Sequence, residues 1–274
     1  MEIVHPDLLA VLRKNRDVVT AINDPLGNVG MLGMNHLFPP FNDLRARRAI
    51  LTAMSQEDYM SAFVGDDKNI WKPMPGFFVP GSPLYNEDGG EILKGRRDFD
   101  AAKRLLAQSG YSGQPVTLMA AQDLPNQKAW GDVTVDLLQR LGVKVDFAAI
   151  DWGTVIALRA QKTSPRQGGW QMYINGKYGV EAADPTNSWL RSDGNQALNG
   201  WANSPLVEAE LAAWYEANSF NEEMAAARRL NKAAMDHVLY APLGMYLRYH
   251  AWRKNVTGVA QAPLPLFWDV GKSV

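Results

Sequence analysis

The chain has 274 residues, of which 46% are apolar and 21% are charged, and its formal net charge is −1. This composition predicts a folded globular protein of one large or two ordinary domains and gives no electrostatic sign of a nucleic-acid partner. The chain contains no cysteine, which excludes disulfides, thiolate metal sites and cysteine nucleophiles. No apolar run reaches the ~20 residues that a membrane-spanning helix needs.

Short strands and helices are expected in the N-terminal third. Asn42 or Asp43 is a suitable N-cap for a helix whose apolar face ends at Met54. The glycine- and proline-rich stretch 66–95 predicts a long ordered loop. The other elements expected here are a short helix over 6–13, strands over 17–22 and 30–35, and a short helix over 56–64.

Residues 98–152 carry the clearest pattern. Asp98 precedes an alanine-rich helix that Gly110 is expected to end, since glycine tolerates the left-handed backbone found after many helices. The apolar run 115–120 indicates a buried strand, and a helix with apolar residues at three- and four-residue spacing follows it to Leu141. Residues 143–147 then alternate as a strand does. These lengths predict a βαβ unit with parallel strands and a right-handed crossover.

The C-terminal third combines irregular stretches with two strong helix starts. Ser204 and Pro205 open a predicted helix, because proline is tolerated at the first helical position. The other expected elements are a helix over 153–161 capped by Asp151, a strand over 170–174, an irregular stretch over 177–204, a helix capped by Asn221 that runs to about 238, a strand over 243–249 and a loosely structured tail from 256.

Histidines and tryptophans are the remaining candidates for chemistry. The four histidines show no metal-binding spacing, so neither a metal nor a cofactor is expected. Trp189 and Trp201 lie among Gly, Asn, Ser and Asp residues, where they fit either a core or the wall of a ligand cleft. Trp130 and Trp214 lie on predicted helices, which favours helix packing.

Five segments in order along the chain resemble one family. MNHLFPPFNDLRARRAILTAMSQEDYM, from Met34, resembles the pattern N-x-x-x-P-P-F-x-D-x-R-x-R-x-A-[IL]. FDAAKRLLAQSGY, LLQRLGVKVDFAAIDW, ADPTNSWL and NVTGVAQAPLPLFWDV resemble further recurring segments. Together they are similar to the bacterial extracellular solute-binding proteins of family 5, the dipeptide, oligopeptide and nickel receptors of ABC importers.

This resemblance implies an α/β fold of the type II periplasmic-binding-protein class, in which a mixed sheet is flanked by helices. Family members are about twice as long, so the chain is expected to be a C-terminal half that lacks the N-terminal lobe and its export signal. Residues 1–33 would belong to lobe I or the hinge, 34–242 to lobe II, and 243–274 to a segment that returns toward lobe I.

The same resemblance implies a periplasmic, non-catalytic protein that closes around a solute and delivers it to the permease. In peptide-binding relatives an acidic residue four positions before the loop proline pairs with the peptide's α-amino group. Glu181 stands at that position before Pro185. The other candidate ligand-binding residues are Tyr178, Trp189 and Trp201 as apolar walls, Asp184 as a brace of the loop, and Trp152 at a strand end.

Three alternatives remain open from the sequence. The Trp-rich loop suits an oligosaccharide or an opine-like ligand. A hydrolase would use Glu181 and Asp184 as paired acid and base, but two carboxylates three residues apart on one loop do not flank a bond as such pairs must. An interaction domain with an exposed apolar face is the third alternative.

Overall fold

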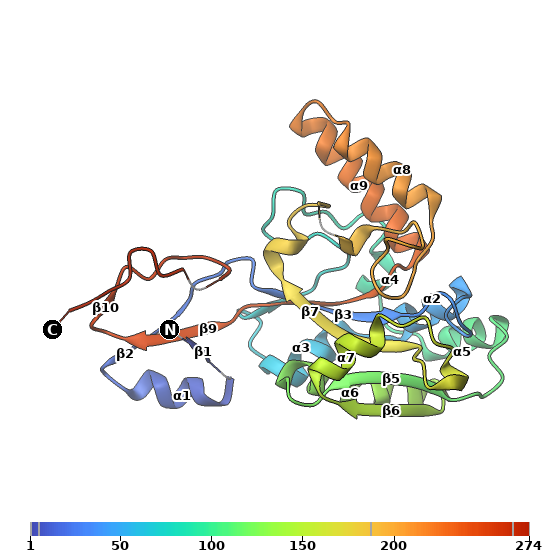
Figure 1. The fold of residues 1–274 in the computed structure, drawn as a ribbon, viewed down its shortest axis with the longest axis horizontal. Coiled ribbons are helices and arrows are strands. Elements are labelled where there is room, and N and C mark those ends of the chain that lie inside the picture. The colour runs from blue at the N-terminus through green and yellow to red at the C-terminus, as the bar shows by residue number, and fades with distance from the viewer. Residues whose placement is uncertain (1, 5, 187, 265, 274) are drawn as a thin grey trace.

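The computed structural model describes residues 2–4, 6–186, 188–264 and 266–273. The described chain forms a large mixed α/β body and a smaller body that holds both ends of the chain (Figure 1). The helices are α1 (Pro6–Lys14), α2 (Leu44–Ala53), α3 (Gln56–Val64), α4 (Glu91–Lys94), α5 (Phe99–Gln108), α6 (Pro125–Arg140), α7 (Trp152–Arg159), α8 (Pro205–Tyr215) and α9 (Phe220–His237).

A six-stranded sheet organises the large body. Its strand order is β4 (Trp71–Lys72), β8 (Ala241–Tyr246), β3 (Asn28–Met34), β7 (Met172–Tyr178), β5 (Val116–Ala121) and β6 (Val145–Ile150). Strand β3 runs antiparallel to both of its neighbours, whereas β5 runs parallel to β6 and β7. Helices α3 and α6 pack on this sheet and on each other. The predicted mixed sheet flanked by helices is confirmed.

The predicted βαβ unit is confirmed as β5, α6 and β6. Strands β5 and β6 pair in parallel from Val116 opposite Val145 to Ala121 opposite Ile150. Helix α6 lies close to the sheet because Gly131 has no side chain: a Cβ there would come within 2.8 Å of the Ala120 Cβ. The strand register and Gly131 together account for the parallel pairing of β5 with β6 and for the close approach of α6 to the sheet.

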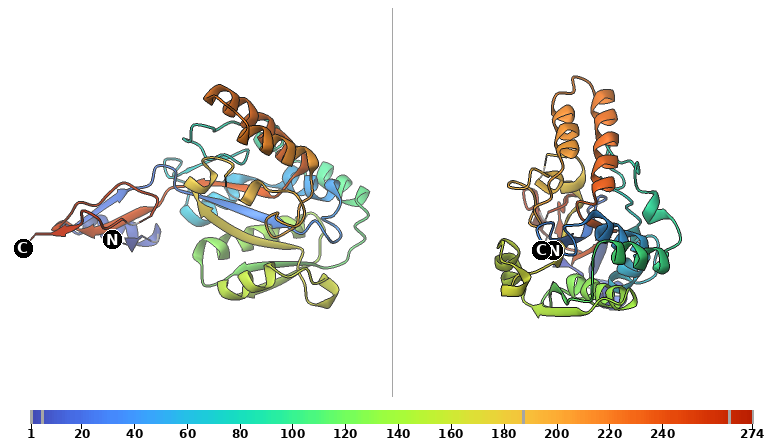
Figure 2. Two further views of the ribbon diagram at one scale, coloured as in Figure 1. Left: turned by 45° about the horizontal axis from the view of Figure 1, so that its top comes forward. Right: turned by 90° about the vertical axis from the view of Figure 1, so that its right-hand side faces the viewer.

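The smaller body is a three-stranded antiparallel sheet with α1. Strand β9 (Tyr249–Arg253) lies between β1 (Glu2–Ile3) and β2 (Val18–Ile22). The C-terminal tail adds a short pair, β10 (Val256–Thr257) and β11 (Gly271–Lys272). Figure 2 shows this body extending from one side of the large sheet, while α8 and α9 project from the large body as a pair. Two chain passages, 23–27 and 247–248, connect the bodies.

The expected domain borders fall inside strands of the large sheet. The border between 33 and 34 lies within β3, and the border between 242 and 243 lies within β8. Both strands pair with neighbours on both sides of these points, so neither can be divided between two bodies. The structure favours borders at the two connecting passages.

Four of the N-cap residues predicted from the sequence cap their helices. Asp43, Asp98, Asp151 and Ser204 each accept a hydrogen bond from a backbone N–H in the first turn of the helix they precede. The expected cap at Asn221 is wrong, because the Ser219 side chain caps α9 two residues earlier. The strand expected over 243–249 is two strands, β8 and β9, separated by residues 247–248. The strand expected over 170–174 extends as β7 to Tyr178.

Trp130 is the aromatic centre of the core. Its side chain is fully buried, and its indole Nε1 donates to the Tyr59 carbonyl at 2.9 Å. The rings of Phe63 and Tyr246 meet it edge-on at centroid distances of 6.2 and 5.7 Å. The expectation that Trp130 serves helix packing is confirmed. Among the described residues, no helix is both long and apolar enough to cross a bilayer.

We predict that Trp130→Ala lowers the free energy of unfolding by about 3–5 kcal/mol, because it leaves a large cavity and an unpaired carbonyl. Urea denaturation would measure the change. Trp268→Ala is the matched control, since Trp268 is 87% exposed, and its effect should stay within about 0.5 kcal/mol. Similar losses in both variants would contradict the role of Trp130.

Candidate functional site

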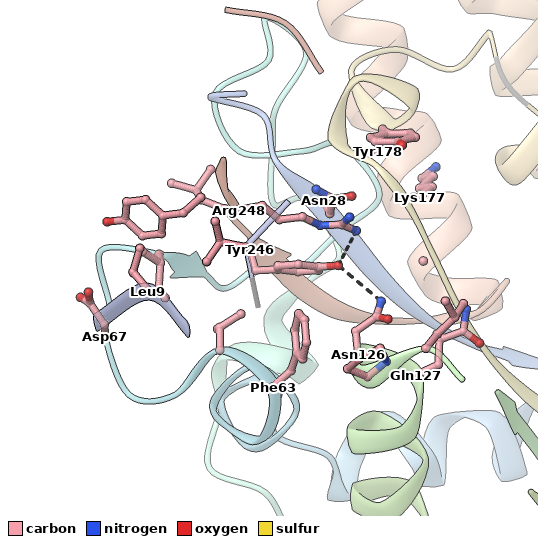
Figure 3. A pocket seen from close by; sticks show the side chains of 18 of the residues that line it. Leu9, Asn28, Phe63, Asp67, Asn126, Gln127, Lys177, Tyr178, Tyr246 and Arg248 are labelled. Atoms are coloured by element: carbon pink, nitrogen blue, oxygen red, sulfur yellow. Dashed lines mark hydrogen bonds between the residues drawn. The ribbon is translucent and has the colours of Figure 1, made fainter. Parts of the chain in front are cut away.

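A pocket of about 690 Å³ lies where the large body meets the smaller one (Figure 3). The large body contributes residues from β3, α3, α6, α7 and the end of β7. Val4, Leu9 and Tyr249 of the smaller body, together with Leu247 and Arg248 of a connecting passage, form the rest of the lining. A molecule bound here would therefore touch both bodies.

A row of three polar side chains crosses the sheet at the pocket. Asn28 of β3 is paired with Tyr178 of β7 on one side and with Tyr246 of β8 on the other. Cross-strand partners project on the same face of a sheet. The antiparallel register therefore brings together residues that lie far apart in the sequence, and all three line the pocket.

Tyr246 connects this row to a hydrogen-bonded cluster. Its hydroxyl accepts from Arg248 Nη2 at 2.9 Å and from Asn126 Nδ2 at 3.4 Å, as the dashed lines in Figure 3 show. Burial raises the pKa of Tyr246, although nearby Arg248 opposes the shift. The phenol therefore stays neutral and acts as a fixed hydrogen-bonding group.

Two polar atoms of pocket-lining residues have no partner among the described residues. Arg248 Nε and Gln127 Oε1 are both buried without a hydrogen bond, and the Gln127 residue as a whole is 3% exposed. Buried polar groups in folded proteins are nearly always paired, and leaving one unpaired costs about 1–3 kcal/mol. Both atoms are therefore unsatisfied groups beneath the pocket surface rather than part of it.

Three of the six predicted site residues meet in this pocket: Trp152, Tyr178 and Glu181. Glu181 is exposed, and its Oε2 accepts from the Tyr178 backbone N–H at 2.9 Å, which caps the short 3-10 helix η2 (Gly179–Ala182). No hydrogen bond to the other carboxylate oxygen is present among the described residues. Trp152 begins α7, and the Arg159 guanidinium lies 5.2 Å from its ring centroid.

The other three predicted residues lie outside this pocket. Trp201 is buried with its ring 5.7 Å from that of Trp170, so it belongs to the core. Trp189 meets the edge of Tyr240 at 5.8 Å. Asp184 accepts from both the backbone N–H and the hydroxyl of Thr186, at 2.8 and 2.5 Å, and so braces its loop.

Six further residues that line the pocket were not predicted from the sequence: Asn28, Asn126, Gln127, Lys177, Tyr246 and Arg248. One signal was present for Lys177, because it is the single charged residue of β7. Arg248 was hidden because it was assigned to a continuous strand, although it lies in the passage between β8 and β9. No metal-binding group of three or more His, Cys, Asp or Glu side chains occurs in the described part of the chain.

Lys177 has an unusual environment for a lysine. It is 7% exposed, its Nζ lies 4.1 Å from the centroid of the Trp189 ring, and it donates to the Glu181 carbonyl at 3.3 Å. Burial lowers the pKa of Lys177 to about 7, and the charge of Glu181 only partly opposes this shift. Desolvation of an ammonium group is the physical cause.

The fold is that of the periplasmic binding proteins. NikA from Staphylococcus aureus, solved with Ni(L-His)2, superposes with a TM-score of 0.79 at 15% identity. The alignment covers 98% of this chain and 56% of the NikA chain. A dipeptide-binding protein from a Pseudoalteromonas species, solved with Met-Leu, gives a TM-score of 0.77 at 18% identity, covering 97% of this chain and 52% of its own. The fold class implied by the sequence is confirmed.

Sequence comparison narrows this class to a family. The model for bacterial extracellular solute-binding proteins, family 5 Middle, matches residues 1–199. A protein from Sinorhizobium fredii named as a probable peptide ABC transporter periplasmic-binding protein is 30% identical over 268 residues, which are 97% of this chain and 50% of that protein. The chain belongs to family 5 of the bacterial extracellular solute-binding proteins. It spans about half the length of the curated relatives it matches.

We predict that Lys177 makes stability depend on pH. Its folded-state pKa of about 7 lies below its ordinary value of 10.5, so the unfolded chain binds more protons between these values. Lys177 therefore makes the free energy of unfolding rise from about pH 7 to about pH 10, and this contribution is lost as the pH falls through 7. Urea denaturation across this window should show a smaller rise in Lys177→Met.

Lys162→Met is the matched control, because Lys162 also lies over a tryptophan ring, that of Trp201 at 5.5 Å, but is exposed. Its pH dependence should equal that of the unmodified protein. If Lys177→Met retains the full rise, the desolvated state of Lys177 is disproved.

Proposed function

We propose that the chain is part of the solute-binding component of an ABC importer, which binds a peptide or similar small polar solute between two lobes and delivers it to the permease. Family membership and the peptide-binding names of relatives support this function. The observation that carries it is the pocket between the two bodies, lined by aromatic rings and by polar side chains. Concave sites of this composition are typical of small-molecule binding.

Glu181 is the proposed partner of the ligand's ammonium group. One oxygen caps η2, and this bond fixes the carboxylate at the pocket while the second oxygen stays available. An ammonium group brought to this oxygen would gain a charge-assisted hydrogen bond. The cap holds the Glu181 side chain back against the Tyr178 backbone.

Two of the alternatives, the hydrolase and the oligosaccharide receptor, lose the features that suggested them. The hydrolase would need Asp184 beside the substrate, but Asp184 is engaged by Thr186 and lies outside the pocket lining. The oligosaccharide hypothesis drew on Trp189 and Trp201, which also lie outside it. One matching relative is named as a probable peptide ABC transporter periplasmic-binding protein and another as a di/tripeptide-binding protein, and these names support a non-catalytic role.

The remaining parts of this proposal concern the whole protein. The N-terminal lobe of the same protein would form the opposite wall of the cleft, and the membrane permease would receive the solute. The family and the name of the relative in Sinorhizobium fredii support a periplasmic location. Closure of two lobes around a solute is the movement expected of such proteins.

We predict that the complete protein binds short peptides and that Glu181→Gln weakens this binding about ten- to hundred-fold, the range of a charge-assisted hydrogen bond. Glutamine can still cap η2, so the pocket keeps its shape. Calorimetry with a peptide and its N-acetylated form measures the effect, and only the free amine should lose affinity in the variant.

Glu216→Gln is the control, because Glu216 is exposed and lies outside the pocket lining. Equal losses for the free and the acetylated peptide would rule out the ammonium role of Glu181. Absence of binding by any peptide would rule out a peptide as the ligand.

A further inference from the structure

We propose that Lys177 couples ligand binding to the release of a proton: a ligand ammonium that pairs with Glu181 withdraws the Glu181 charge from Lys177, and Lys177 then loses a proton to the buffer. This proposal rests on the proposed function and adds a dependence of binding on pH. It is argued from three features: the apolar surroundings of Lys177, the carboxylate that acts on it, and the place of that carboxylate at the pocket.

The register of the sheet places Lys177 among apolar side chains. Lys177 stands opposite Val29 of β3, and Val29 stands opposite Met245 of β8. Cross-strand partners project on the same face of a sheet. Both neighbours are buried and belong to a small apolar cluster, whose other buried members are Met74, Val79 and Ala182. The Lys177 ammonium is therefore held where little water reaches it.

No carboxylate contacts the Lys177 ammonium directly. Its Nζ donates to the Glu181 carbonyl at 3.3 Å and lies 4.1 Å from the Trp189 ring centroid. No ion pair of Lys177 is present in the part of the chain that the structure describes. A carbonyl and an aromatic face offset only part of the cost of removing an ammonium group from water. The balance between ammonium and neutral amine is therefore sensitive to a nearby charge.

Glu181 is the carboxylate that acts on Lys177. Burial lowers the pKa of Lys177 to about 7, and the charge of Glu181 raises it in part. The two residues lie four positions apart, where the chain passes from β7 into η2. The Lys177 proton is thus retained in part by the negative charge of Glu181.

The other titratable groups around Lys177 are neutral or engaged elsewhere. The facing positions of β3 and β8 are apolar. On the aromatic side, Tyr240 meets the Trp189 ring at 5.8 Å, and burial raises the pKa of Tyr240, so its phenol is neutral. In the loop after η2, Asp184 accepts two hydrogen bonds from Thr186. A change in the charge state of Glu181 is therefore the change that Lys177 would sense.

Lys177 does not need to touch the ligand. Lys177 and Tyr178 are consecutive in β7, so their side chains project from opposite faces of the sheet, and Figure 3 shows the two residues beside each other. Glu181 connects the two faces, because its carboxylate lies at the pocket while its carbonyl accepts from Lys177. A ligand ammonium bound to this carboxylate forms a charge-assisted hydrogen bond and neutralises the charge that favoured protonated Lys177.

The sign of the pH dependence follows from the proton balance. When the ligand ammonium binds, the Lys177 ammonium becomes a neutral amine and the buffer takes the proton. A complex that holds fewer protons than the free protein forms more readily as the pH rises. A fall of one unit in the Lys177 pKa would raise the affinity by nearly tenfold from about pH 6 to about pH 7.5, below the pKa of a peptide amine.

The test is isothermal titration calorimetry of the complete protein at pH 7, in phosphate and in Tris buffer. These buffers differ in protonation enthalpy, so the difference between the two heats gives the number of protons exchanged. The probes are the dipeptide Met-Leu, with which the related Pseudoalteromonas protein was solved, and its N-acetylated form. The variants are Lys177→Met, Glu181→Gln and the control Lys162→Met, since Lys162 is exposed and lies over a different tryptophan ring.

We expect the unmodified protein and Lys162→Met to release about 0.4 proton more per bound Met-Leu than Lys177→Met does, the amount given by a one-unit fall from a pKa of about 7. Glu181→Gln, which removes the charge but keeps the cap, should release less than the unmodified protein. The acetylated peptide should release no proton from any of these proteins. Thermal unfolding of each variant shows whether the fold is kept.

The contrary outcomes are separable. Met-Leu binding with the same proton exchange in Lys177→Met as in the unmodified protein overturns the coupling and leaves the peptide function intact. Equal release with Met-Leu and with its acetylated form also overturns the coupling, and this comparison needs no variant to fold. Failure of both probes to bind overturns the coupling together with the peptide ligand.

Discussion

The placement of the Trp130 indole against the sheet determines much of the rest of the structure. A Cβ at Gly30 of β3 would lie 3.0 Å from this ring, and one at Gly176 of β7 would lie 3.5 Å from it. The two glycines thus leave a shallow space on the sheet that the indole fills from α6. Its contact with Tyr246 then transmits the position of α6 to the support of Arg248. The Trp130 ring therefore contributes both to the packing of the core and to the position of Tyr246 at the pocket.

The second constraint is that two chain passages connect the bodies. Residues 23–27 and 247–248 join the large sheet to the smaller body, and the pocket borders the second passage. A solute that contacts Arg248 in this passage and Tyr178 on the sheet links the passage to the rigid body. Movements between such bodies are absorbed by a few residues at element ends. The passage is short, and Leu247 is tied to Ile70, so its backbone freedom is restricted on the side of the large body.

Local signals allowed much of the fold to be predicted, and the site much less. The caps at Asp98, Asp151 and Ser204 and the βαβ unit depend on residues close together in sequence, where spacing is informative. Asn28, Tyr178 and Tyr246 meet only through strand register, which a single sequence does not show.

Trp201 illustrates the opposite error in the site prediction. Its polar neighbours suggested a cleft, but a backbone turn with φ of 56° directs its ring into the core against Trp170. Such a left-handed conformation is uncommon outside glycine, so composition gives no warning of it. Among the aromatic residues predicted as walls of the site, Tyr178 lines the pocket and Trp189 and Trp201 do not. The direction of the side chain, rather than the residue type, accounts for this difference.

The charges beside η2 connect the site to the protonation of the protein. Arginine stays protonated at any physiological pH, whereas Lys177, with a pKa lowered by burial to about 7, is only partly charged near neutrality. Arg248 is therefore the constant positive charge at the pocket, and Lys177 is the variable one. Glu181 acts on Lys177 by its charge and offers a carboxylate oxygen at the pocket. A solute without an ammonium leaves this charge to Lys177, whereas a solute with one competes for it, and burial then favours the neutral amine.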